Sequence, residues 1–235
     1  MSPGSSGFAR ANTYAPQPSA TYMLNRDVPV EDLGMLYAFA APEATFENRA
    51  LSRILARHLR VSAFETLRTE EQLGYAAGGG ALDLFKHPLL IFYIQTPVKG
   101  PQDMLDRFNA YTLEYREELA SLSEESFEKF KTGVLTALTE PPKNLSDEAG
   151  PYASDWAIEN YRFDTRSKLI AAVEAATLDD IKAFFDATVF SEDKSRIVIQ
   201  LRGKRFASES FAMVEGGLVV DDVDAFHSDM PVQTK

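Results

Sequence analysis

Cysteine is absent from this chain of 235 residues, which excludes disulfide bonds, thiol nucleophiles and cysteine-ligated zinc. Histidine is scarce, since only His58, His87 and His227 can serve as imidazole ligands or bases. Basic residues are outnumbered, because 24 Lys and Arg against 35 Asp and Glu leave a net charge of −11. A phosphate backbone requires a basic face, so we predict no nucleic-acid partner. No apolar run approaches the ~20 residues that cross a bilayer, so we also predict no membrane partner.

The chain is nevertheless rich in core-forming residues, with 45% hydrophobic and 11% aromatic side chains. Residues 1–20 are rich in Ser, Gly, Pro and Ala and lack apolar periodicity, so we predict a disordered tag or linker there. We predict that residues 21–208 form a single α+β domain. Residues 209–235 are predicted to form a C-terminal arm that packs on this domain.

Apolar periodicity predicts the order of the elements along the domain. Strands are predicted over residues 21–24, 33–39, 73–84, 89–95 and 195–201, with one helix from Pro42 to about Leu67 and several helices between residues 101 and 190. The predicted N-caps of the later helices are Ser123, Ser146, Asp164 and Thr177. Because most strands follow one another without a crossover helix, we predict an antiparallel or mixed sheet of about five strands with helices on one face.

Most catalytic signatures are missing from the sequence. It contains no G-x-S-x-G, no phosphate-binding G-x-x-x-x-G-K, and neither H-E-x-x-H nor H-x-x-E-H. His58 falls on the apolar face of a predicted helix and is predicted to be a core residue rather than a ligand. A catalytic zinc needs three protein ligands, so we predict no metal or cofactor site in this chain. Gly78–Gly80 lie inside a predicted strand and indicate either a bulge or a close approach of another backbone.

One polar segment joins a predicted helix to a predicted strand. Arg68 falls at the end of the helix, and Tyr75 follows seven residues later at the start of the strand. A short turn can leave both side chains near one edge of the sheet, where they would donate hydrogen bonds to one carbonyl oxygen or oxyanion. Alternatively, Arg68 only complements the helix C-terminus and Tyr75 is an ordinary strand aromatic. The residues alone leave both interpretations open.

The string Leu67-Arg68-Thr69-Glu70-Glu71-Gln72-Leu73-Gly74-Tyr75 resembles the L-R-T-x-E-Q-L-G-Y signature of the insulinase (pitrilysin) family of zinc metallopeptidases. Residues 141–145 and 177–181 are also similar to that family. In the family the signature lies in the C-terminal half, which does not bind zinc. The resemblance implies the half-domain fold of the LuxS and processing-peptidase type, within an enzyme of four such domains that closes around a peptide.

The resemblance also implies roles for two residues. Arg68 and Tyr75 are expected to be auxiliary catalytic residues that bind substrate carbonyls and stabilise the tetrahedral intermediate. The zinc of the parent enzyme is expected in an N-terminal half, which would be the partner of this domain in binding peptide substrates. The chain has no H-x-x-E-H, so alone it is expected to be inactive. For the compartment we expect the bacterial periplasm or the cytoplasm.

Two other functions fit the same residues. One is a non-catalytic scaffold or partner subunit with the same fold, and the other is a peptide-binding module that adds a substrate strand to a sheet edge. The net charge of −11 also raises the hypothesis of an acidic inner surface that favours basic or neutral peptides, with solubility as the simpler explanation.

Overall fold

The computed structural model describes residues 19–229, so the tag or linker predicted over residues 1–20 lies outside them except for its last two residues. The strands are β1 (Thr21–Asp27), β2 (Leu33–Ala40), β3 (Ala76–Leu84), β4 (His87–Thr96), β5 (Ser195–Arg202) and β6 (Gly217–Val219). The helices are α1 (Phe46–Phe64), α2 (Pro101–Ala120), α3 (Glu124–Thr139), α4 (Leu145–Ala157), α5 (Thr165–Ala175), α6 (Leu178–Val189) and α7 (Val223–Asp229), with a π-helical turn η1 (Glu65–Glu70) and a 3-10 turn η2 (Lys204–Phe206).

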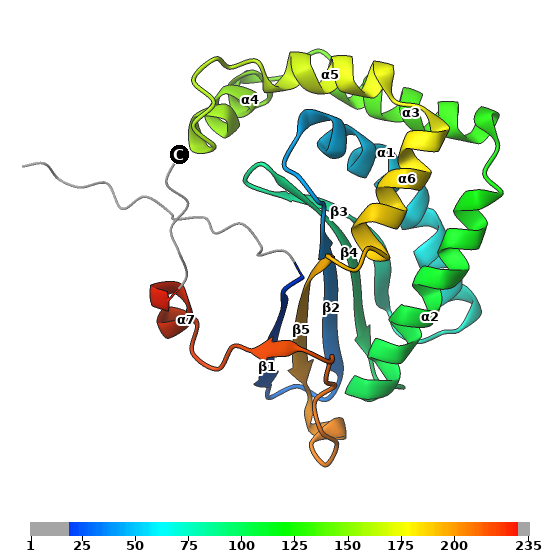
Figure 1. Ribbon diagram of the computed structural model, residues 1–235, viewed down its shortest axis with the longest axis vertical. Coiled ribbons are helices and arrows are strands. Elements are labelled where there is room, and N and C mark those ends of the chain that lie inside the picture. The colour runs from blue at the N-terminus through cyan, green and yellow to red at the C-terminus, as the bar shows by residue number, and fades with distance from the viewer. Residues whose placement is uncertain (1–18, 230–235) are drawn as a thin grey trace, which may run out of the picture.

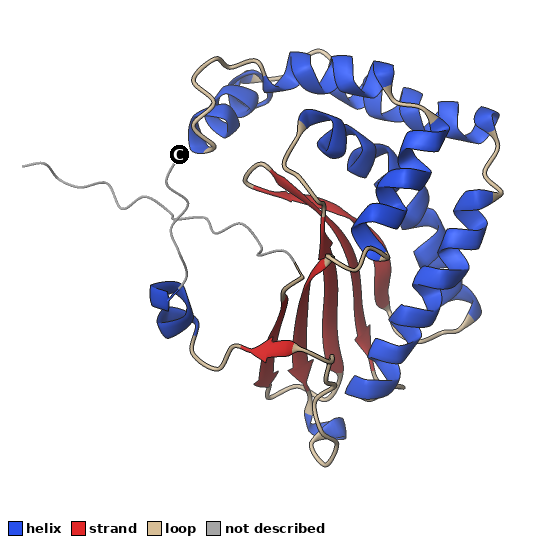
Figure 2. Ribbon diagram, viewed as in Figure 1, coloured by secondary structure: helices blue, strands red, loops and turns tan. Residues whose placement is uncertain are grey.

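One mixed sheet, in the order β3-β4-β2-β5-β1-β6, organises the domain (Figure 1). Strand β2 pairs antiparallel with β4 and β5, whereas β1 pairs parallel with β5 and β6. Helices α2, α3 and α6 stand on one side of the sheet, and α7 lies on the other side (Figure 2). The predicted α+β class with a mixed sheet is therefore confirmed.

The sheet has a sixth strand that the sequence did not predict. Strand β6 lies within the segment predicted as a C-terminal arm, and the Val220 N–H donates a 2.7 Å hydrogen bond to the Met23 carbonyl. Three residues are too few to show an alternating pattern, so this strand depends on its pairing with β1. No helix within residues 19–229 combines the length and the apolar character needed to span a membrane.

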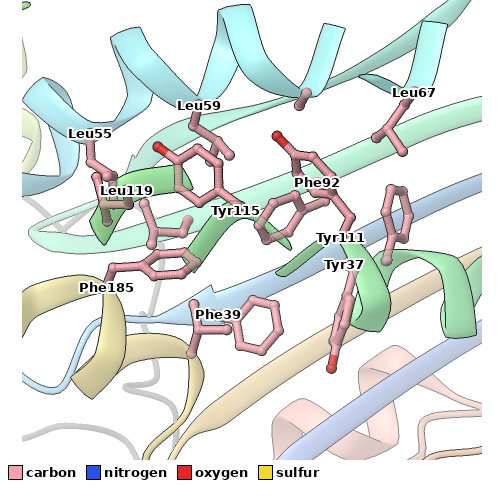
Figure 3. Close-up of a cluster of buried hydrophobic side chains, with 14 of the residues drawn as sticks. Tyr37, Phe39, Leu55, Leu59, Leu67, Phe92, Tyr111, Tyr115, Leu119 and Phe185 are labelled. Carbon is pink, nitrogen blue, oxygen red and sulfur yellow. The ribbon is translucent and has the colours of Figure 1, made fainter. Parts of the chain in front are cut away.

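The core lies between the sheet and the helices and is dominated by aromatic side chains (Figure 3). Six aromatic side chains from β2, β4, α2 and α6 form its centre, and each is at most 2% exposed: Tyr37, Phe39, Phe92, Tyr111, Tyr115 and Phe185. Burying one such side chain contributes roughly 1.5–3 kcal/mol. These contacts pack α2 and α6 onto β2 and β4.

A buried polar network connects α1 to α2. The His58 Nδ1 lies 2.8 Å from the Tyr115 hydroxyl, and the Ser62 hydroxyl lies 2.7 Å from the Tyr111 hydroxyl. His58 is 8% exposed, which confirms the prediction of a core histidine. Burial lowers the pKa of His58, and the charge of Glu118 opposes this shift. Burial also raises the pKa of Tyr115 well above its ordinary value. The network therefore joins the imidazole of His58 and the buried hydroxyls to the Glu118 carboxylate, which accepts a hydrogen bond from the Ser62 hydroxyl.

The predicted helix caps are correct in two cases. Ser123 and Thr177 cap α3 and α6 with their side chains, and Thr177 forms a capping box with Asp180. The prediction of Ser146 was wrong, because Asn144 caps α4 by accepting a 2.9 Å hydrogen bond from the Asp147 N–H. Asp164 occupies the N-cap position of α5, but its side chain does not cap the helix.

Candidate functional site

The segment between α1 and β3 holds both predicted site residues. Here α1 widens into η1, where the Glu71 N–H donates a 3.0 Å hydrogen bond to the Thr66 carbonyl, five residues back. Gln72 then ends the turn with φ +52°, in the left-handed region. Short π-helical turns of this kind often mark functional sites. Arg68 lies in η1, and Tyr75 lies immediately before β3.

The structure brings Arg68 and Tyr75 together. The guanidinium carbon of Arg68 lies 4.6 Å from the centre of the Tyr75 ring and 4.7 Å from the centre of the Phe64 ring. Tyr75 is 85% exposed, whereas Arg68 is half-buried. Within residues 19–229 neither side chain forms a hydrogen bond or an ion pair. Since stacking uses the faces of a guanidinium, its N–H groups stay available to an acceptor from outside.

The turn that carries these two residues is anchored on both sides. Leu67 and Leu73 are buried, at 0% and 4% exposure, and the Leu73 N–H donates to the Leu67 carbonyl at 3.0 Å. Arg107 of α2 donates from its Nε to both carboxylate oxygens of Glu71 at 2.9 Å. This bonding raises the pKa of Arg107, which therefore stays charged. Sequence reasoning missed Arg107, since no local pattern connects it with a partner 36 residues earlier.

Two glycines let the surrounding elements approach closely. A Cβ at Gly74 would lie 2.0 Å from the carbonyl oxygen of Gln95 in β4, so only glycine fits before Tyr75. A Cβ at Gly79 would lie 2.7 Å from Cγ of Leu59 in α1. Strand β3 pairs with β4 at every residue from 76 to 84, so there is no bulge. Both interpretations of the glycine run were therefore wrong, because there is no bulge and the atoms that approach Gly79 belong to the Leu59 and Ala63 side chains of α1 rather than to another backbone.

Within residues 19–229, no three His, Asp or Glu side chains converge as a set of ligands. The chemistry of the Arg68–Tyr75 pair is instead hydrogen-bond donation from a cation and a phenol, which suits a carbonyl oxygen or an oxyanion.

Comparisons with known proteins show which proteins this chain resembles. Residues 54–153, which include the whole Arg68–Tyr75 segment, match the family described as PQQ synthase PqqF-like, C-terminal lobe domain 4. Protease 3 of Escherichia coli K12 is 26% identical over 190 residues, which are 81% of this chain and 20% of the relative. The human insulin-degrading enzyme is 29% identical over 143 residues, 61% of this chain and 14% of the relative. This chain is a homologue of the pitrilysin-type C-terminal domain.

The fold of this pitrilysin-type domain is also found in solved structures. The crystal structure of pitrilysin matches with a TM-score of 0.88 at 23% identity, over 97% of this chain and 24% of pitrilysin. A peptidase M16 inactive domain from Pseudomonas fluorescens matches with a TM-score of 0.59 at 12% identity, over 88% of this chain and 48% of that one. The domain thus spans about a fifth of the length of Protease 3.

Proposed function

We propose that this pitrilysin-type domain uses Arg68 and Tyr75 to bind a carbonyl of a peptide substrate and to stabilise the tetrahedral intermediate of its hydrolysis. The observation that supports this proposal is that two hydrogen-bond donors stand together, open to solvent and without a partner among the described residues. A scaffold subunit of the same fold does not require an exposed tyrosine stacked on an arginine that has no ion pair.

The two donors have complementary chemistry. The Arg68 guanidinium carries a permanent charge and several N–H groups in a plane, so it favours an oxygen that becomes negative during the reaction. The Tyr75 hydroxyl adds a neutral donor at the same place. Removing one preorganised donor of this type lowers kcat by roughly 10²–10³-fold.

The anchoring of the turn supports preorganisation. Leu67, Leu73 and the Glu71–Arg107 ion pair hold the backbone on both sides of the pair, and Gly74 seats the chain against β4. Donors that are already in place need no rearrangement when charge develops, which is the condition under which such groups contribute most.

The proposal requires a partner for the bond-breaking step. The described residues offer no set of metal ligands, and the chain covers about a fifth of the length of Protease 3, so we place the zinc of the parent peptidase in an N-terminal half. The 235-residue chain alone should therefore bind an extended peptide without cleaving it.

Kinetics of the full-length enzyme that contains this domain test the proposal. We expect Arg68→Ala to lower kcat about 100-fold or more, and Tyr75→Phe, which keeps the ring and loses only the hydroxyl, to lower it about 100-fold. Arg68→Lys should recover only part of the loss, because an ammonium cannot reproduce the planar fork.

Matched controls separate catalysis from folding. Arg205 is an exposed arginine on η2, after β5, and Arg205→Ala should leave kcat unchanged. Urea unfolding of each variant should show no loss of stability beyond about 0.5 kcal/mol, as for other surface substitutions. Wild-type turnover in both Arg68→Ala and Tyr75→Phe would reject the proposed roles.

A further inference from the structure

The exposed face of α1 carries a row of arginines that leads to Arg68. Residues 53, 57, 60 and 64 recur at three- and four-residue steps, so their side chains share one face of the helix. Three of them are arginines, the fourth is Phe64, and the row continues into Arg68 of η1. We define the arginine face as Arg53, Arg57, Arg60 and Arg68.

Most of this face lacks an acidic partner. Arg53 donates to Asp83 of β3 at 2.7 Å, but Arg57 and Arg60 are exposed and form no ion pair or hydrogen bond within residues 19–229. The Arg57 guanidinium lies over Gly133 of α3, where the missing side chain makes room for it. Among the other exposed arginines, Arg116 is paired with Asp186, whereas Arg162 and Arg205 have no ion pair within residues 19–229 but stand singly rather than in a row.

The absence of partners is notable in a chain with 35 acidic and 24 basic residues. Glu65 and Glu70 lie at the same helix end, yet neither comes within 4.0 Å of an arginine nitrogen. The net charge suggested an acidic inner surface, but the α1 surface that adjoins the Arg68–Tyr75 pair carries three arginines without an ion pair, Arg57, Arg60 and Arg68, beside Glu65 and Glu70. A cationic face left open beside a peptide-binding pair favours negatively charged groups of the bound peptide.

We infer that the arginine face is a specificity subsite for acidic side chains of the peptide, a conclusion that rests on the proposed function of Arg68 and Tyr75. Arg60 and Arg57 precede Arg68 by eight and eleven residues, which is about 12 Å and about 16 Å along a helix. An extended peptide advances about 3.3 Å per residue. Acidic side chains roughly four to five positions from the carbonyl held by Arg68 therefore meet Arg60 and Arg57.

Strand addition to β3 is a weaker alternative for peptide binding. Although β3 is an edge strand, residues 77–80 are buried, and α1 packs against them through Leu59 and Ala63. Figure 1 shows α1 above this strand. The side chains of α1 are thus more open to a peptide than the middle of the strand is.

A charge swap on the 235-residue chain tests the inference. Three fluorescein-labelled, unstructured peptides are identical except at two positions, four and five residues from a central residue, which are both Glu, both Gln or both Lys. Fluorescence anisotropy at about 0.05 M salt, where the Debye length exceeds 10 Å, gives each Kd. We expect the order Glu, Gln, Lys from tightest to weakest, with roughly a two- to fivefold step per exposed charge pair.

The double variant Arg57→Glu/Arg60→Glu should reverse this order, whereas Arg205→Glu should leave it unchanged. Raising the salt concentration to about 0.5 M should bring the three Kd values together. The same order in the wild type and the double variant would overturn the inference, as would a failure of the Glu peptide to bind with a Kd below about 1 mM. An oligonucleotide of equal charge that binds as tightly would indicate a general anion surface and would also overturn it.

The same assay separates this inference from the proposed function. Binding of the Gln peptide should weaken in Arg68→Ala but not in the double variant. A reversed charge order together with unchanged Gln-peptide binding and unchanged turnover in Arg68→Ala would reject the carbonyl-binding role and retain the subsite. If Gln-peptide binding weakens in Arg68→Ala and the order of the three peptides is not reversed in the double variant, the subsite would be rejected and the carbonyl-binding role retained.

Discussion

Gly74 is predicted to decide whether the Arg68–Tyr75 pair can form at all. The Cβ of an alanine at this position would lie 2.0 Å from the Gln95 carbonyl oxygen and 3.0 Å from its carbonyl carbon. Both atoms belong to the backbone of β4, which pairs with β2 and β3 and cannot move alone. Overpacking usually costs 1–3 kcal/mol, and a backbone obstacle belongs at the upper end, so we expect Gly74→Ala to lower the free energy of unfolding by about 3 kcal/mol.

Two glycines of β3 provide matched substitutions. The Cβ of Gly79→Ala would meet Leu59 Cγ at 2.7 Å and Ala63 Cβ at 3.2 Å. The Leu59 side chain can change its rotamer, whereas Ala63 Cβ moves only with the backbone of α1, so we expect a loss of about 1–2 kcal/mol. Around Gly80 there is no atom within 4 Å of the added Cβ. Gly80→Ala should therefore be neutral or should stabilise the domain by about 0.5 kcal/mol, because alanine restricts the unfolded chain.

Urea unfolding followed by far-UV circular dichroism gives the three free energies. Fluorescence is less suitable, because the single tryptophan, Trp156, is 66% exposed on α4. For a chain of this size 1 kcal/mol corresponds to roughly 2–4 °C in Tm, so Gly74→Ala should melt about 6–12 °C lower. Equal stability of Gly74→Ala and Gly80→Ala would refute the argument that close approach to β4 fixes the turn. A stable Gly74→Ala that still bound peptide normally would also refute it.

Three further substitutions test other parts of the domain. Burial lowers the pKa of His58 below its ordinary 6.5, so the stability that this residue contributes is complete above pH 6.5 and is lost as the pH falls below that value. The free energy of unfolding measured from pH 7.5 to 5 should therefore change less with pH in His58→Gln than in the wild type. The slope that one group contributes is at most about 1.4 kcal/mol per pH unit. Glu71→Ala leaves Arg107 with only Glu114 as a partner and should lower the free energy of unfolding in urea by about 2 kcal/mol. An equal loss from Glu71→Ala in an Arg107→Met background would disprove an energetic coupling between Glu71 and Arg107. Thr177→Ala removes the capping box of α6 and should cost about 1 kcal/mol, with Thr177→Ser, which should keep wild-type stability, as the control.

The sequence by itself determined most elements and the identity of the candidate pair. Apolar periodicity located β2, α1, β5 and the β3–β4 hairpin, because these signals are local and each faces the same core. Thr177 was recognised as a cap for the same reason, since the bonding partners of a cap lie within three residues. Arg68 and Tyr75 were named from the signature, and their closeness follows from the short turn between them.

The tertiary structure alone decided how that pair is held and what surrounds it. Gly74 lies against Gln95, Glu71 pairs with Arg107, and β6 pairs with β1, and each of these contacts joins residues far apart in the sequence. The same holds for the arginine face, since periodicity places Arg57 and Arg60 on one side of a helix but cannot tell whether an acidic residue from another element covers them. Local patterns specify elements, whereas the partners of a side chain depend on contacts that exist only in the folded domain.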